Sequence, residues 1–266
     1  MAKLQDMFTQ ARRAQGGGGI GFLGKSRPES KAHAAALVVE FTQTTAGSAE
    51  AALKAGADGL LFTWDGKDSS VLDTLKQEID SAKAVNENAV TGLHITGNVD
   101  NLDRDSLSRL KDQGVQYLIL PFNAPARLLA LENKDLEKVV TVPMRKEENY
   151  PLYIRNLTAF DGIAAVLLDF GLIGQVASMT IEDVLVYRAV REAVRFPAFL
   201  YVKSGLSEAD AYTISTLGVQ GVILTANNAS ETTRGYIKAL RELLEKIHQD
   251  EKDQDTPSVP NTSKGR

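Results

Sequence analysis

The chain has 266 residues, a length that fits one α/β barrel of about 250 residues as well as two smaller domains. Its 43% hydrophobic and 24% charged residues can build a large core, which excludes a disordered or collagen-like protein. The net charge of -4 argues against nucleic acid as a partner, and the absence of cysteine excludes disulfides, thiolate metal sites and iron–sulfur clusters.

The N-terminal residues Met1–Asp6 lack the apolar core of a secretory leader, and no uncharged apolar run reaches the roughly 18 residues that a membrane span needs. We therefore expect a cytoplasmic protein with no membrane partner. Residues Leu4–Gln15 form a predicted helix ahead of the first strand. We expect residues 1–31 to be an N-terminal addition to the main domain, with the helix at the bottom of that domain.

A glycine run, Gly16–Gly19, follows this helix and together with Gly21 matches the dinucleotide-binding pattern G-x-G-x-x-G. The run follows a helix rather than a strand, so we interpret it as a flexible linker. Basic residues on both sides support a second interpretation, a mobile lid that gathers anions. These residues are Arg12, Arg13, Lys25 and Arg27.

The most informative pattern is a junction in which a helical stretch ends at a glycine and a short apolar strand begins soon after it. Glycine caps a helix in the left-handed conformation at little cost, and the aliphatic run that follows is typical of a strand buried on both faces. The junction recurs at Gly56, Gly114, Gly162 and Gly218, ahead of predicted strands at 59–62, 117–120, 165–168 and 221–224.

Each interval between these junctions has room for two strand–helix units, and further β-rich runs at 36–41, 89–95, 139–143 and 198–203 fill the remaining positions. Helices with a 3.6-residue apolar period are predicted at 48–54, 70–84, 105–111, 181–194, 207–216 and 232–247. This alternation predicts an α/β fold, a (β/α)8 TIM barrel over residues 32–248, with a doubly wound open sheet as the alternative. The polar residues 249–266 have almost nothing to bury, so we expect a disordered C-terminal tail.

In such a barrel the active site forms at the carboxyl ends of the strands, so polar residues there are the candidates. Glu40, Asp169 and Lys203 each follow directly on an apolar run, where burial can adapt a side chain to acid, base or nucleophilic chemistry. His94 lies within the third strand and can donate to a substrate carbonyl or phosphate. The structural alternatives are an ion pair of Glu40 or Asp169 with Lys203, and a core role for His94.

The loops after the seventh and eighth strands form the candidate phosphate site, because many barrels bind phosphate there through backbone N–H groups. Ser204 and Gly205 lie in the first loop, where a small residue and a glycine let the backbone approach an anion. Asn227 and Asn228 lie in the second loop. The segment Ser207–Asp210 is predicted to start the next helix with a capping box.

This last third of the chain resembles the aldolase-type phosphate-binding barrels, the broad group that includes phosphoribosylanthranilate isomerases, thiazole synthases and deoxyribose-phosphate aldolases. The resemblance rests on the Ser204–Gly205 step, the run Ser207–Ala211 and the glycine turn Leu217–Gly218, and it implies a phosphate site at these loops. Two positions depart from the pattern. Thr225–Asn228 replaces the usual glycine after strand eight, and Asp169 stands where deoxyribose-phosphate aldolases carry their Schiff-base lysine, which disfavours aldol chemistry by that route.

We therefore expect a lyase or isomerase acting on a small phosphorylated metabolite, with Asp169 and Glu40 as acid and base. Lys203 would be an electrostatic partner or the nucleophile. One alternative is an oxidoreductase that uses flavin mononucleotide (FMN), because aldolase-type barrels also bind that cofactor's phosphate at these loops. The other is a non-catalytic barrel that serves as a binding or scaffold protein. The sequence implies no metal site, and it is compatible with a homo-oligomer.

Overall fold

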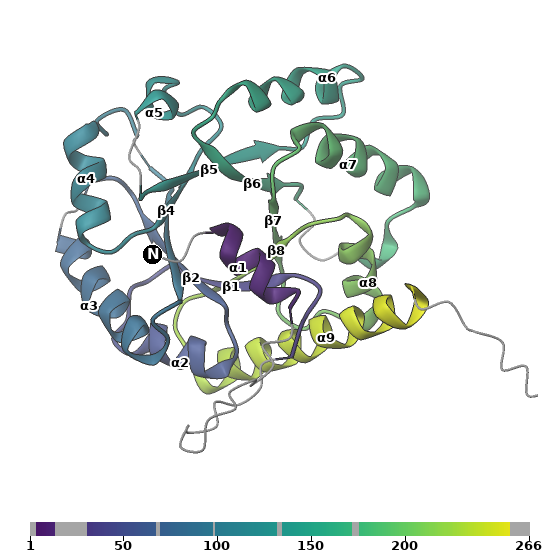
Figure 1. Cartoon of the computed structure of the whole chain (residues 1–266), viewed down its shortest axis with the longest axis horizontal. Helices are drawn as coiled ribbons and strands as arrows, with labels where there is room; N and C mark the ends of the chain where they lie inside the picture. The colour runs from purple at the N-terminus through teal and green to yellow at the C-terminus, as the bar shows by residue number, and fades with distance from the viewer. Residues whose placement is uncertain are drawn as a thin grey trace, which may run out of the picture.

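The computed structural model describes residues 4–13, 31–67, 70–97, 99–131, 135–171 and 176–255. Within these residues, eight parallel strands close into one barrel in chain order, with the later helices around it and the first helix across one end (Figure 1). The barrel closes where the first and last strands pair, from Ala36 beside Gly221 to Phe41 beside Ala226. The predicted (β/α)8 fold is confirmed, and the open-sheet alternative is wrong. The glycine run and its suggested lid residues Lys25 and Arg27 lie outside the described residues.

The strands and helices follow one another in strict alternation from the first strand onward. The strands are β1 (Ala36–Phe41), β2 (Gly59–Trp64), β3 (Val90–Ile95), β4 (Tyr117–Leu120), β5 (Glu137–Pro143), β6 (Ile163–Asp169), β7 (Ala198–Val202) and β8 (Gly221–Ala226). The helices are α1 (Leu4–Ala11), α2 (Ser48–Ala55), α3 (Ser70–Val85), α4 (Arg104–Asp112), α5 (Arg127–Ala130), α6 (Tyr150–Ile154), α7 (Ile181–Val194), α8 (Glu208–Thr216) and α9 (Glu231–Asp255), and the 3-10 helices are η1 (Arg155–Ala159) and η2 (Val176–Ser178). None of the described helices is long and apolar enough to cross a membrane.

Three of the four predicted glycine junctions adopt the expected left-handed backbone. The φ angles are 114° at Gly56, 95° at Gly114 and 74° at Gly218. Gly162 is different, because it follows the irregular η1 turn and has no positive φ. A Cβ at Gly162 would come within 2.8 Å of the Leu129 carbonyl oxygen, so glycine is needed there for close approach of the backbone.

Side chains alternate along each strand between the barrel interior and the surrounding helices. Val38 and Leu61 point inward and belong to the interior cluster. Leu37 and Leu60, one residue earlier on the same strands, belong to the larger cluster that packs against the helices. The alternation determines which residues near the strand ends can face the centre of the barrel.

Aromatic rings fill the interior of the barrel. Tyr117 and Phe199 stack with ring centroids 6.2 Å apart, and both are buried. Gly92 faces the Tyr117 ring so closely that an added Cβ would come within 2.1 Å of it. The glycine on β3 therefore makes room for the tyrosine on β4, and the interior is a packed core rather than a pore.

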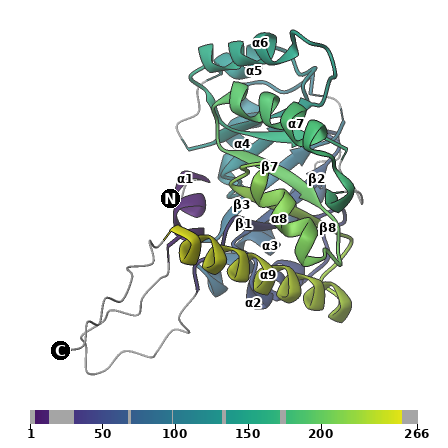
Figure 2. The ribbon, with the colours of Figure 1, turned by 90° about the vertical axis from the view of Figure 1, so that its right-hand side faces the viewer.

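Helix α1 closes the amino end of the barrel. Leu4, Met7, Phe8 and Ala11 are buried and join the interior cluster, and the Phe8 ring lies 5.0 Å from that of Phe199. Figure 2 shows α1 at one end of the barrel, on the side where both described chain ends lie. The predicted N-terminal helix and its position at the bottom are confirmed, although it ends at Ala11 rather than Gln15.

The last helix is longer than the sequence indicates. Helix α9 continues through Asp255, past the predicted start of the tail at Gln249. Polar side chains in these turns bond to α8, since the Tyr212 hydroxyl donates to Asp250 and the Ser215 hydroxyl donates to Glu251. The polar composition of residues 249–255 had led to the prediction that they belong to a disordered tail. Residues 256–266 of the expected tail lie outside the described part of the chain.

Candidate active site at the barrel mouth

Four polar side chains from four different strands meet at the mouth of the barrel. The carboxylate of Glu40 on β1 accepts hydrogen bonds at Oε1 from His94 Nδ1 on β3 (2.7 Å) and from the Tyr201 hydroxyl on β7 (3.0 Å). Its Oε2 accepts a hydrogen bond from the Thr225 hydroxyl on β8 (2.8 Å). Side chains that are far apart in sequence thus converge on one carboxylate.

Strand geometry explains why Glu40 is the centre of this group. Its neighbours Val39 and Phe41 face the helices, so residue 40 faces inward and is only 4% exposed. A buried carboxylate without partners would be strongly destabilising, and three hydrogen bonds to the ion offset its loss of water. The expected alternative of an ion pair between Glu40 and Lys203 is wrong, because Glu40 pairs with His94.

The Glu40 contact determines the tautomer of the His94 ring. Because Nδ1 faces a carboxylate oxygen, we assign the ring proton to Nδ1, which leaves the lone pair on Nε2. Nε2 has no hydrogen-bond partner among the described residues, and the side chain is 20% exposed. His94 therefore has one nitrogen held by the protein and one free to exchange a proton with a bound molecule.

Tyr201 is a member of this site that the sequence did not indicate. Its hydroxyl lies 3.1 Å from His94 Nδ1 as well as 3.0 Å from Glu40. Burial, together with the charge of Glu40 and the hydrogen bond to it, raises the pKa of Tyr201 above its ordinary value. The tyrosine therefore stays neutral and acts as a hydrogen-bond donor rather than a base. Its position on β7, two residues before Lys203, was the available signal, but a tyrosine in an apolar strand also fits a core role.

Asp169 and Lys203, the other two predicted catalytic residues, lie at the rim. Both side chains are exposed, and neither has a hydrogen bond or ion pair with another described residue. The expected ion pair between Asp169 and Lys203 is therefore not formed. Asp169 lies close enough to Tyr201 for its charge to contribute to the raised pKa of that hydroxyl. The structure thus brings Glu40 and His94 together and leaves Asp169 and Lys203 as rim charges.

The loop after β7 has the open backbone around a glycine that was expected of a phosphate-binding loop. Gly205 has a φ of 76°, and its Cα faces open space. The predicted capping box is confirmed, since Ser207 and Asp210 bond to one another's backbone N–H groups at the start of α8. Hydrogen bonds from Ser207 hold the pKa of the Asp210 carboxyl below its ordinary value, so this helix start already carries a negative charge. A second negative charge is therefore disfavoured at this helix start.

In the loop after β8, the side-chain oxygens of both asparagines accept hydrogen bonds from other residues of the protein. Asn227 Oδ1 accepts a hydrogen bond from the Thr42 hydroxyl (2.8 Å), and Asn228 Oδ1 accepts from the backbone N–H of Ser230 (3.1 Å). Both side chains are exposed. Their amide nitrogens have no partner among the described residues and remain available as donors.

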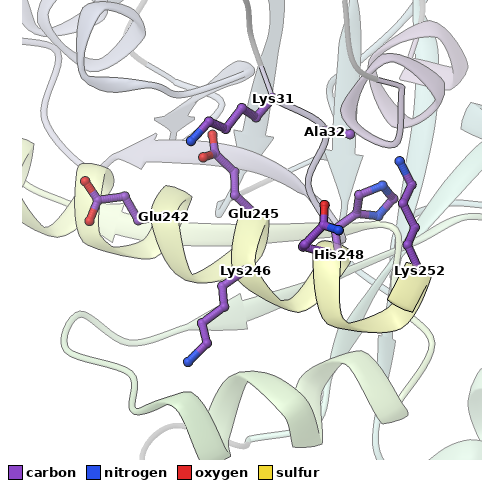
Figure 3. Close-up of a pocket in the computed structure, with 8 residues that line it drawn as sticks. Lys31, Ala32, Glu242, Glu245, Lys246, His248 and Lys252 are labelled. Carbon is purple, nitrogen blue, oxygen red and sulfur yellow. The ribbon is translucent and has the colours of Figure 1, made fainter. Parts of the chain in front are cut away.

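Two cavities among the described residues lie away from the Glu40–His94 pair. A cavity of about 30 Å³ lies between the loop of Lys203–Leu206 and α9, and it has room for about one water. A cavity of about 510 Å³ lies between α9 and the segment before β1, with Lys31, Glu245 and His248 in its lining (Figure 3). Neither cavity is lined by Glu40 or His94. Within the described ranges, no group of three or more His, Asp and Glu side chains is placed to hold a metal ion.

Comparisons with known proteins agree with this architecture. No protein-family model matches the chain, and no curated protein matches its sequence. Many solved structures match, among them tryptophan synthase from M. tuberculosis (TM-score 0.58, 16% identity, 81% of this chain and 94% of that one). An HpcH/HpaI aldolase from Desulfitobacterium hafniense (0.54, 11%, 97% and 99%) and a phosphoribosyl anthranilate isomerase (0.56, 13%, 81% and 99%) also match. The chain shares the TIM-barrel fold of these proteins, and at these identities the likeness supports the fold alone.

Proposed function

We propose that this barrel is a lyase or isomerase that acts on a small phosphorylated metabolite at the carboxyl ends of its strands. The observation that carries the proposal is the 2.7 Å hydrogen bond between Glu40 and His94, with the second nitrogen of His94 left unpartnered. A histidine held by a carboxylate on one nitrogen is a general acid–base group on the other. Both reaction classes need such proton transfer.

The roles of the three central residues follow from their contacts. His94 Nε2 takes a proton from a carbon or hydroxyl group of the substrate and returns it to the product. The imidazolium formed in between keeps its Nδ1 proton in the hydrogen bond to Glu40, whose negative charge stabilises it. Glu40 is thus a positioning residue, and the neutral Tyr201 hydroxyl helps to hold the carboxylate in place. Asp169 is the candidate for a second acid or base, because it lies at the rim near Tyr201.

The phosphate would be held by the two loops at the rim. Gly205 supplies an open, left-handed backbone position beside Ser204, and the amide nitrogens of Asn227 and Asn228 are free donors. Lys203 adds an unpaired positive charge to the same loop. Two proteins of this fold support the assignment by what they act on: the matched isomerase was solved with a ribulose 5-phosphate compound, and another match is a 3-hexulose-6-phosphate synthase.

Ligand binding tests this proposal directly. We expect ribose 5-phosphate, glyceraldehyde 3-phosphate or inorganic phosphate to raise the melting temperature of the wild-type protein. A ligand at 100 times its Kd adds about 2.7 kcal/mol, which is several degrees for a domain of this size. Gly205→Asp should remove the shift, because it places a negative side chain in the loop. The matched control is Gly218→Asp, which strains another left-handed glycine at the opposite end of the barrel and should keep the shift.

The other outcomes separate the alternatives. A shift with FMN alone would favour the flavin oxidoreductase, and a shift that survives Gly205→Asp would place the ligand elsewhere. No shift with any of these compounds would contradict the proposal and favour the non-catalytic barrel.

A further inference from the structure

An arginine is held over two aromatic rings at the carboxyl end of the barrel. Arg145 follows β5, and its guanidinium carbon lies 5.9 Å from the centre of the Phe122 ring and 5.5 Å from that of the Tyr150 ring. Phe122 follows β4 and Tyr150 begins α6, so these contacts join the connections that leave two neighbouring strands. Cation–π contacts orient a side chain that otherwise samples many rotamers.

The two rings are themselves fixed by the barrel. Tyr150 is 2% exposed, and its hydroxyl donates a hydrogen bond to the carbonyl of Pro143 at the end of β5 (2.7 Å). Burial raises the pKa of Tyr150, so this hydroxyl stays protonated and keeps the hydrogen bond. Phe122 packs against the larger cluster between the strands and the helices. The guanidinium therefore has a defined position next to the end of β5.

The described residues leave the charge of Arg145 without a counter-charge in contact. The side chain is exposed, and it has no hydrogen bond or ion pair with another described residue. Asp169 is on the neighbouring strand, where its carbonyl accepts a hydrogen bond from the N–H of Met144 (3.0 Å), but its carboxylate makes no ion pair with Arg145. Ring contacts hold the cation without accepting all of its planar N–H donors, which remain available to a bound anion.

Arg145 lies across the mouth from the loop after β8, part of the proposed phosphate site. In a closed ring of eight strands, β4 and β5 are opposite β8 and β1. Figure 1 shows α6, which follows Arg145, and α9, which follows the loop after β8, on opposite sides of the barrel. A substrate bound by its phosphate at the loops after β7 and β8 can thus extend its other end across the Glu40–His94 pair toward Arg145.

We propose that Arg145 forms a second anion subsite, so that the substrate carries a carboxylate or a second phosphate group at the end opposite its first phosphate. A guanidinium binds either group through two parallel N–H···O hydrogen bonds. This inference rests on the proposed function and narrows the substrate class of the same site. It gives Arg145 a role in specificity and none in proton transfer.

Calorimetric titration with two matched pairs of six-carbon compounds tests the subsite. 6-Phosphogluconate has a carboxylate where sorbitol 6-phosphate has a terminal alcohol, and fructose 1,6-bisphosphate has a second phosphate that fructose 6-phosphate lacks. We expect the doubly anionic member of at least one pair to bind about 10-fold or more tightly than its match, since hydrogen bonds to charged groups are strong. The pair that shows this gain identifies the group as a carboxylate or a phosphate.

Variants of the loop after β5 assign the gain to the oriented arginine. Arg145→Met should remove the gain and leave the Kd of the singly phosphorylated compounds unchanged. Phe122→Leu should reduce the gain, because it removes one of the two rings. The matched control is Lys146→Met, which removes the same charge from the next position, where the described residues provide no ring contact, and it should keep the gain. Circular dichroism checks that each variant is folded.

The outcomes separate this inference from the proposed function. If the singly phosphorylated compounds bind and neither pair shows a gain, the subsite is wrong and the proposed phosphate site stands. A gain that survives Arg145→Met, or that Lys146→Met removes equally, would also overturn the subsite. Loss of all binding in Arg145→Met would mean that Arg145 holds the first phosphate and that no second subsite exists. If none of the four compounds binds, the proposed function fails and the subsite fails with it.

Discussion

Glu40 and His94 are joined by a hydrogen bond whose effect on the ring can be observed without knowing the substrate. We expect Glu40→Gln to lose the preference for a proton on His94 Nδ1, because the amide can present either an acceptor or a donor to that nitrogen. The chain has only three histidines, so nitrogen NMR of the ring can resolve this tautomer. Once a substrate is found, kcat should fall by about 100-fold or more.

Thr225→Val is the control for this experiment. It removes the hydrogen bond to Glu40 Oε2 and leaves the Oε1 contact with His94 in place, so the tautomer should not change. If Glu40→Gln leaves His94 with the same tautomer as the wild type, the carboxylate does not position the ring and its assigned role is wrong.

Asp58 makes stability depend on pH at the amino end of the barrel. Its carboxylate accepts hydrogen bonds from His33 Nε2 (2.7 Å), the Leu37 N–H (2.7 Å) and Arg241 Nη1 (2.8 Å). Burial alone would raise the pKa of Asp58, but the hydrogen bond and charge of His33 and the charge of Arg241 hold this pKa below its ordinary value. The carboxylate therefore stabilises the fold above about pH 3.9, the value for an unfolded chain, and this contribution is lost as the pH falls through the folded pKa.

Asp58→Asn should consequently lower the free energy of unfolding by about 3 kcal/mol at pH 7, because His33, the Leu37 N–H and Arg241 lose the charged acceptor of their hydrogen bonds. Urea unfolding of both proteins at pH 7 and in steps below pH 4 measures this difference. The two curves should approach each other as the pH falls. A difference that is the same at every pH would mean that packing rather than charge explains the effect.

At the scale of elements, α1 stabilises the barrel through its buried face. Phe8→Ala removes a ring that packs 5.0 Å from Phe199, and we expect a loss of about 3–5 kcal/mol in thermal or urea unfolding. Gln5→Ala on the exposed side of the same helix should change stability by less than about 0.5 kcal/mol. Equal effects of the two substitutions would show that helix formation, and not the contact with the barrel interior, determines how much α1 contributes to the free energy of unfolding.

The elements that could be predicted from the sequence are those whose pattern is local. Strands such as β1 and β4 are runs of mostly apolar residues, and their bounds were predicted to the residue. Helices α5 and α6 have only 4 and 5 residues, too few to show a period, and they were missed. The end of α9 was missed because its polar side chains bond to α8, which composition does not reveal.

The candidate site was predictable only in part, for a related reason. Strand alternation and strand ends indicated Glu40 and His94 as inward or mouth residues. Their pairing depends on how β1 and β3, which are not neighbours in the sheet, face each other across the closed barrel. Tyr201 was missed for the same reason, since only the closed barrel brings its hydroxyl to Glu40.

At the scale of the whole molecule, the barrel keeps its two ends apart. The amino end is closed by α1, and the carboxyl ends of the strands carry the candidate site. Substitutions in α1 and substitutions at the candidate site thus act at opposite ends of the barrel.

The packed interior beneath the site has a consequence for kinetics. Phe8, Phe199 and the Tyr117 ring over Gly92 fill the barrel between α1 and Glu40, so no route leads through it. Whatever enters at the carboxyl ends must leave by the same opening. Substrate and product then compete for one vestibule, and the product of the proposed reaction should act as a competitive inhibitor whose effect high substrate concentration overcomes.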